Sequence, residues 1–128
     1  MTLDYLSNIN SYGEHLVRIY NFNQSQAAAF YDVFKTTIIE NRAVLDLSEV
    51  LFIDRNGINL KFRIFPEDEG LRTNDGTNFF CDMTYESFEN MLRLMEPFCH
   101  KETRTYQYLY DLDIETDLIF SPEGTWDM

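Results

Sequence analysis

Hydrophobic and polar residues alternate along several short stretches of the chain, and a period of two residues is typical of β-strands. In the stretch from 58 to 65, Ile58, Leu60 and Phe62 alternate with polar or charged residues. This pattern predicts a strand with one face in the core and one face in water. The same kind of pattern predicts further strands over residues 14–22, 77–83, 103–112 and 116–120. Residues 1–12 lack it and are expected to form a short helical turn or loop.

Two other stretches have hydrophobic residues at the three- and four-residue spacing of an amphipathic helix. The first is Ser25 to Asn41, where Asn23 or Ser25 is placed to cap the first turn. The second begins after the N-cap residue Thr84 and ends at Pro97. The expected core-facing residues of the two helices are Ala27, Phe30, Tyr31, Phe34 and Ile38, then Tyr85, Phe88, Leu92 and Met95.

The clearest turn signal is the pair Asn56-Gly57, because these residues accept the positive φ values of a tight hairpin turn. We therefore predict a hairpin that joins a short strand at 51–53 to the strand at 58–65. Residues 43–50 are expected to be extended or loop-like. The stretch 66–76, rich in charged and turn-forming residues, is expected to be a polar loop.

These elements follow one another in the order β-α-β-β-β-α-β-β. Each helix has a single hydrophobic stripe to bury, so the economical arrangement places both helices on one face of a sheet. We predict an α+β fold with a mainly antiparallel sheet of five to six strands and two helices packed on one face. At 128 residues the whole chain, 1–128, is expected to form a single domain.

Charge is the feature of composition that most limits function. The chain has 22 acidic and 10 basic residues, a net charge of −12, which repels phosphate backbones and argues against a nucleic-acid partner. The N-terminus does not resemble a signal peptide, and no apolar run approaches the ~20 residues that span a bilayer, so no membrane association is expected. Only Cys81 and Cys99 are present, and both are expected to be reduced. We expect a cytoplasmic protein of bacterial type.

Residues 14–57 resemble the anti-sigma-factor-antagonist (STAS) domains. The resemblance rests on a strand at Leu16–Ile19, a helix at 25–41, and the run from Leu45 to Gly57. In that family a similar strand leads into an Asp-Ser-Ser-Gly turn whose serine is phosphorylated. The corresponding turn here, Asp54-Arg55-Asn56-Gly57, has no hydroxyl group, and a strand pattern follows where the family has a helix. No phosphorylation site is therefore predicted.

Catalytic and metal-binding patterns are weak in this sequence. His15, Cys81 and the pair Cys99-His100 lack the short ligand spacing of zinc sites, and they are interpreted as structural or surface residues. No nucleophile elbow or phosphate-binding glycine motif is present. We therefore predict no catalytic residue, no metal and no cofactor. The alternative is a small-molecule-binding domain or small enzyme with a pocket between sheet and helices, reached by His15, His100 or a tyrosine hydroxyl.

The most specific candidate site is a tyrosine ladder on the predicted strand 103–112. Tyr106, Tyr108 and Tyr110 would share one face of that strand, either packed beneath a helix or exposed as a recognition surface. The chain after Arg104 contains no Lys or Arg, and it is rich in acidic residues. The predicted partner-binding residues are Tyr106, Tyr108, Tyr110, Asp111, Asp113, Glu115 and Asp117.

An acidic aromatic patch of this kind suits a basic protein partner. In size and charge the chain resembles small acidic inhibitors of nucleases, such as the immunity proteins of bacterial toxin systems. That resemblance implies a non-catalytic interaction domain. Two other interpretations stay open: the acidity serves solubility alone, or an exposed sheet face or edge forms a homodimer.

Overall fold

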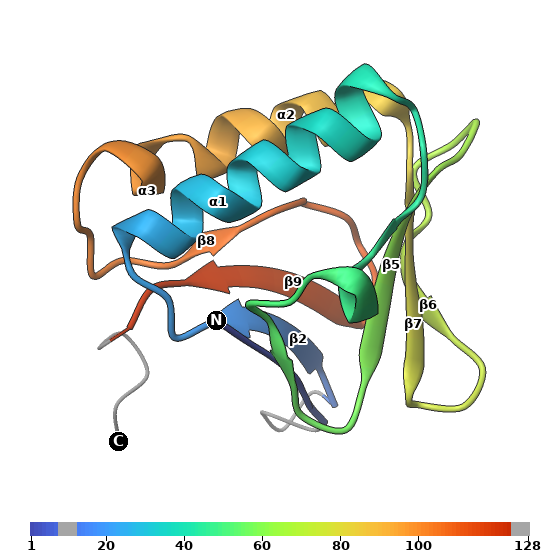
Figure 1. Cartoon of the computed structure of the whole chain (residues 1–128). Helices are drawn as coiled ribbons and strands as arrows, with labels where there is room; N and C mark the ends of the chain where they lie inside the picture. The colour runs from blue at the N-terminus through green and yellow to red at the C-terminus, as the bar shows by residue number, and fades with distance from the viewer. Residues whose placement is uncertain (8–12, 124–128) are drawn as a thin grey trace.

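The computed structural model describes residues 1–7 and 13–123, and they form an α+β fold with two sheets. Two helices, α1 (Gln24–Phe34) and α2 (Tyr85–Met95), lie side by side across one side of the molecule (Figure 1). A five-stranded sheet lies beneath them, and a four-stranded sheet stands at the right of the view. The hydrophobic core fills the space that the helices and the two sheets enclose.

The five-stranded sheet is mixed. In spatial order its strands are β4 (Asp54–Arg55), β1 (Thr2–Leu6), β2 (His15–Tyr20), β9 (Thr116–Ser121) and β8 (Gln107–Tyr108). The pairs β1–β2 and β8–β9 are antiparallel, whereas β4–β1 and β2–β9 are parallel. The centre of this sheet therefore joins segments from opposite ends of the described chain.

The four-stranded sheet comes from the middle of the chain. Its order is β3 (Leu45–Asp46), β5 (Asn59–Ile64), β7 (Asn78–Met83) and β6 (Gly70–Thr73). The central pair β5–β7 is parallel, and the two outer pairs are antiparallel. A short 3-10 turn, η2 (Leu47–Glu49), follows β3.

Both long helices begin with the side-chain caps that their sequences predict. Asn23 caps α1 in a capping box with Gln26, and the Thr84 hydroxyl accepts a hydrogen bond from the amide of Ser87 at the start of α2. A π-helical stretch, η1 (Lys35–Glu40), continues α1 to the end of the predicted helix. After α2 the chain makes one further short helix, α3 (Pro97–His100).

Phenylalanine rings form the centre of the core. Phe34 of α1 is fully buried and packs edge-to-face against Phe62 of β5 at 5.3 Å and Phe88 of α2 at 5.9 Å, measured between ring centroids. Phe120 of β9 packs edge-to-face against Phe98 of α3 at 5.1 Å and contacts the tilted ring of Phe22 at 4.2 Å. These contacts tie each helix to a sheet, which is what the hydrophobic stripes of the two helices predict.

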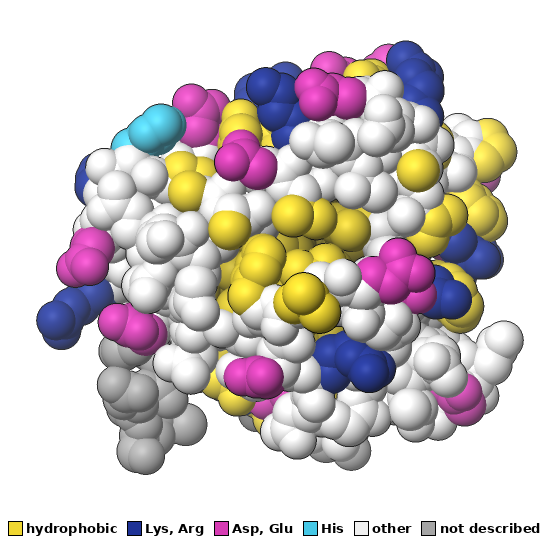
Figure 2. All heavy atoms as spheres, in the orientation of Figure 1, with side chains coloured by type: hydrophobic (Ala, Val, Ile, Leu, Met, Phe, Trp, Pro, Cys, Tyr) yellow, Lys and Arg dark blue, Asp and Glu magenta, His cyan; other side chains and the backbone are white. Residues whose placement is uncertain are grey.

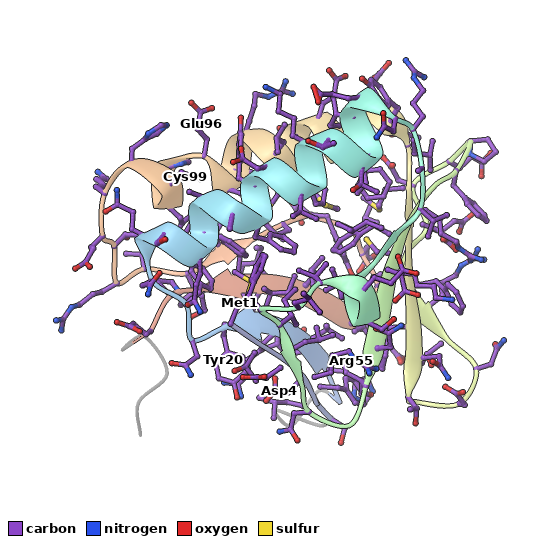
Figure 3. The ribbon with its side chains drawn as sticks, in the orientation of Figure 1. Met1, Asp4, Tyr20, Arg55, Glu96 and Cys99 are labelled. Carbon is purple, nitrogen blue, oxygen red and sulfur yellow. The ribbon has the colours of Figure 1, made fainter. Side chains whose placement is uncertain are left out.

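The outer face of each sheet carries an ion pair. In the four-stranded sheet the fully buried carboxylate of Asp82 accepts hydrogen bonds from Arg63 and Arg72, each with a closest distance of 2.6 Å. Burial alone would raise the pKa of Asp82, but the two guanidinium groups outweigh it and lower the pKa below its usual value. On the five-stranded sheet Arg18 pairs with Asp4 at 2.6 Å and stacks on the ring of Tyr20. Asp4 and Tyr20 are labelled in Figure 3.

The predicted α+β class and both long helices are confirmed, but the sheet prediction needs correction. Instead of one mainly antiparallel sheet of five to six strands, the described residues form two mixed sheets of five and four strands. The parallel pairs in this part of the chain are β1–β4, β2–β9 and β5–β7. Parallel neighbours are distant in sequence, so local alternation could not reveal them.

The predicted hairpin at 51–65 is also wrong. Gly57 does adopt a positive φ of 81°, but the turn connects the two sheets and joins no hairpin pair. Asp54 donates its amide to the carbonyl of Met1, so this segment adds to β1, while β5 pairs with β3 and β7. Leu51 is 99% exposed and belongs to a turn.

Three further boundaries differ from the sequence predictions. Residues 2–6 form strand β1 where a turn or loop was expected, and residues 8–12 lie outside the described part. The expected loop 66–76 contains strand β6. The expected strand 103–112 is reduced to the two residues of β8.

Candidate functional site

The segment that carries β8 and runs into β9 has the exposed acids and aromatic rings that the sequence singled out. We define the acidic–aromatic surface as the side chains of Tyr106, Tyr108, Asp111, Asp113, Glu115 and Asp117. Asp117 is half-buried and the other five are exposed. The surface lies at one edge of the five-stranded sheet, where β8 is the last strand.

Two of the three ladder tyrosines are accessible. The side chains of Tyr106 and Tyr108 are 48% and 45% exposed, and their rings meet edge-to-face with centroids 5.8 Å apart. Burial is the largest cause of a raised pKa for Tyr108, followed by the neighbouring Tyr106 and Asp117. About half of each side chain is therefore accessible to a partner.

Tyr110 is not on this surface, so the prediction of a continuous three-residue ladder is wrong. Its ring is buried, and its hydroxyl donates to the carbonyl of Thr116 and accepts the amide of Leu71 at 3.4 Å. Burial is also the first cause of its strongly raised pKa. Because β8 ends at Tyr108, strand alternation does not continue, and Tyr110 joins the loop to strands β9 and β6.

A glycine allows that loop to pack closely. Gly70, the first residue of β6, has a φ of 77°, and a Cβ atom at this position would lie 2.5 Å from Cδ1 of Ile114. Leu112 and Tyr110 are the next nearest groups. Glycine at position 70 therefore satisfies both the backbone conformation and the space requirement. Its lack of a side chain lets Ile114 and Leu112 of the acid-bearing segment pack against the four-stranded sheet.

Two neighbouring acids perturb the titration of Asp117. The pKa of Asp117 is raised first by burial, then by the negative charges of Glu14 and Asp111. Glu14 was absent from the predicted site. Glu14 lies near Asp117 because β2 and β9 pair in parallel, with His15 opposite Thr116. No local sequence pattern predicts this pairing.

A groove runs along the edge of the sheet beside these residues. It has a volume of about 480 Å³. Asn90 and Leu94 of α2 form one wall, Gln107 and Tyr108 of β8 form the other, and Asp111 and Asp117 line it as well. Tyr110 also contributes to the lining. The groove thus has a partly apolar helix wall and an acidic strand wall.

A second hollow of about 410 Å³ lies at the start of α1. Phe22, Phe98, Lys101 and Arg104 are among its lining residues, and acids are present in it too. His15 and His100, the residues expected to reach a small-molecule pocket, line neither this hollow nor the groove. The aromatic residues of the core fill the space between helices and sheets that such a pocket would need.

The cysteines are both free, and neither has the low pKa of a reactive thiol. Cys81 is buried, which raises its pKa well above the usual value. Burial, with the charges of Asp32 and Glu96, raises the pKa of Cys99 to about 11 (Figure 3). Within residues 1–7 and 13–123, no group of three or more His, Cys, Asp or Glu side chains is arranged to hold a metal ion.

A hydrophobic patch covers another face. Figure 2 shows hydrophobic side chains gathered below α1, with acidic side chains scattered singly around them. Val44 and Leu51, both in the segment between η1 and β4, are the most exposed large aliphatic residues described.

In the described part of the chain, no helix has the length and apolar character needed to cross a membrane.

Comparison with protein families, curated proteins and solved structures found no match. The resemblance of residues 14–57 to STAS domains therefore gains no support. The structure also departs from that family after Gly57, where strand β5 replaces the helix.

Replacing Asp117 with asparagine is expected to stabilise the fold at neutral pH. A carboxyl group whose pKa is raised in the folded state favours folding in its protonated form, and that contribution is lost as the pH rises through the folded pKa. At pH 7 the variant should therefore unfold at higher urea concentration, with a gain on the order of 0.5 kcal/mol. At a pH below the unfolded value of about 3.9, the gain should vanish. A stability loss at pH 7 would contradict this interpretation.

Proposed function

We propose that the protein is a non-catalytic interaction protein that binds a basic protein through the acidic–aromatic surface, as an inhibitor of the immunity-protein kind would. The observation that carries the proposal is the placement of two half-exposed tyrosine rings among four carboxylates at one sheet edge. The sequence from 105 to 128 contains no Lys or Arg.

The physical roles of the two residue types differ. Tyrosine offers a large, rigid contact area at low entropic cost, so Tyr106 and Tyr108 are the expected anchors. The carboxylates supply attraction over about a Debye length and so accelerate encounter with a positively charged partner. The net charge of −12 adds to that attraction and opposes binding to nucleic acids.

The raised pKa of Asp117 also supports the proposal. Burial is the largest cause of that shift, and repulsion by the negative charges of Glu14 and Asp111 adds to it, so the charged form of Asp117 lowers the stability of the fold. A guanidinium or ammonium group from a partner would relieve that repulsion on binding. We further propose that the encounter takes place in the cytoplasm; the two free cysteines are consistent with this proposal, because thiols stay reduced in that compartment.

The test compares two variants that each lose four negative charges. One neutralises the surface (Asp111→Asn, Asp113→Asn, Glu115→Gln and Asp117→Asn), and the control neutralises exposed acids elsewhere (Glu40→Gln, Glu49→Gln, Asp54→Asn and Glu67→Gln). The immobilised proteins capture partners from native lysate at about 50 mM and about 300 mM salt. A captured basic protein is then purified and titrated.

We expect the purified partner to bind the wild type and the control variant with similar affinity. It should bind the surface variant about tenfold or more weakly, and the difference should shrink at high salt. Equal affinity for both charge variants would contradict the proposal, because net charge alone would then explain binding. Failure to capture any basic protein at low salt would also contradict it.

A further inference from the structure

Strand β8 is the outermost strand of the five-stranded sheet, and its backbone geometry fixes which of its groups face outward. Gln107 pairs with Phe120 and Tyr108 with Ile119, and the amide of Leu109 donates to the carbonyl of Leu118 at 2.9 Å. In an antiparallel ladder, residues alternate between hydrogen-bonded and non-hydrogen-bonded pairs. Leu109 is in a hydrogen-bonded pair, so the amide and carbonyl of Tyr108 point away from β9.

The groove of about 480 Å³ lies on that side, between the edge of β8 and the helix α2. One outward group is already engaged in a local contact: the carbonyl of Tyr108 accepts a hydrogen bond from Nε2 of Gln107 at 2.9 Å. This contact is exposed, and a flexible side chain supplies the donor. A backbone amide of another chain could take the same position without any change in β8.

We propose that an extended segment of the basic partner adds to β8 as a further strand and lies in the groove beside α2. This inference rests on the proposed function and specifies the partner's conformation at the site. Main-chain hydrogen bonds to an open sheet edge provide affinity in this mode of recognition, and side-chain pockets provide specificity.

The two walls of the groove define the sequence that such a segment should have. Successive side chains of a strand point to opposite faces. One set would contact Leu94 and the aliphatic part of the helix wall, and the other would meet Tyr108, Asp111 and Asp117. The fitting segment therefore alternates hydrophobic residues with Arg or Lys. A guanidinium group could pair with Asp117 and stack on the ring of Tyr108.

Charge complementarity favours this occupant over a second copy of the chain. If two copies joined through β8, the acidic–aromatic surface of one would lie beside the same surface of the other. Like charges opposed across an interface are unfavourable. A homodimer through β8 is still the competing arrangement, so the test must be able to detect it.

The test uses the full chain and two fluorescent peptides of about six residues, both alternating valine and arginine. In one peptide every second backbone amide is N-methylated, which removes donors and blocks strand pairing but keeps all side chains and charges. Fluorescence anisotropy at low salt gives the two affinities. We expect the methylated peptide to bind at least about tenfold more weakly than the unmethylated one, as loss of one to two hydrogen bonds implies.

Two variants of α2 localise the peptide. Asn90→Arg puts a bulky positive charge into the groove at an exposed position, and Glu86→Gln makes the same change in net charge outside it. The first should weaken binding of the unmethylated peptide about tenfold, whereas the second should leave it nearly unchanged. Thermal unfolding of both variants checks that each remains folded.

The outcomes separate this inference from the proposed function. Equal binding of both peptides, lost in the variant with Asp111, Asp113, Glu115 and Asp117 neutralised, overturns strand addition and leaves the acidic surface as the binding site. Absence of binding by both peptides overturns both proposals. Light scattering of the protein with and without peptide tests for a dimer. A dimer that the peptide does not dissociate would assign the edge of β8 to a second copy of the chain and overturn the peptide as its occupant.

Discussion

Replacement of Phe34 by alanine is expected to lower the free energy of unfolding by about 3–5 kcal/mol. Phe34 is fully buried, and it is the residue of α1 that contacts both Phe62 of the four-stranded sheet and Phe88 of α2. Its removal takes away three aromatic contacts, because Phe30 is adjacent as well. Domains of this size are stable by only about 5–15 kcal/mol, so this loss is a large fraction of the total stability.

Urea unfolding followed by far-ultraviolet circular dichroism measures this loss. Val44→Ala is the matched control, because Val44 is 51% exposed and its truncation should change stability by less than about 0.5 kcal/mol. A cost below about 1 kcal/mol for Phe34→Ala would show that the aromatic contacts between α1, α2 and β5 do not form the centre of the core.

The second large effect is expected from Asp82→Asn. The substitution keeps the shape of the side chain but leaves Arg63 and Arg72 beside each other without the carboxylate that both of them bind. Breaking one side of a buried ion pair typically costs about 3–5 kcal/mol. Because Arg63 and Arg72 are partly exposed and can regain water, we expect a value near 3 kcal/mol at pH 7.

The pH dependence gives this prediction a second readout. A carboxyl group with a depressed folded pKa contributes stability above its unfolded value of about 3.9, and the contribution is lost as the pH falls through the folded pKa. The difference between wild type and Asp82→Asn should therefore shrink on acidification below about pH 4. Glu67→Gln, at an exposed loop position, is the control. A difference that does not depend on pH would contradict the assigned role of the carboxylate.

The parts of the fold that depend on local sequence were predictable. The stripe that includes Phe30 and Phe34 predicted α1, and Thr84 marked the start of α2 at the correct residue. Alternation also located the cores of β2, β5, β7 and β9. Each of these signals lies within about ten residues, where hydrophobic period and capping chemistry are decisive.

Pairing between distant strands was not predictable. Gly57 has the positive φ of a tight turn, but the segments on its two sides do not pair with each other: β4 pairs with β1, and β5 pairs with β3 and β7. The same limit applies to the site. Exposure of Tyr106 and Tyr108 was one of two alternatives, whereas burial of Tyr110 depends on contacts with Leu71 and Thr116, and Glu14 arrives only through the pairing of β2 with β9.

The pairing of β2 with β9 has a consequence for how the protein is made. His15 lies opposite Thr116, so the middle of the five-stranded sheet cannot close until about a hundred residues beyond β2 have left the ribosome. The strands of the other sheet lie between residues 45 and 83, so they can associate with α1 earlier. During synthesis β2, with its hydrophobic residues Val17 and Ile19, stays unpaired on the side that β9 later occupies. This interval is when the nascent chain is most open to aggregation and to chaperones.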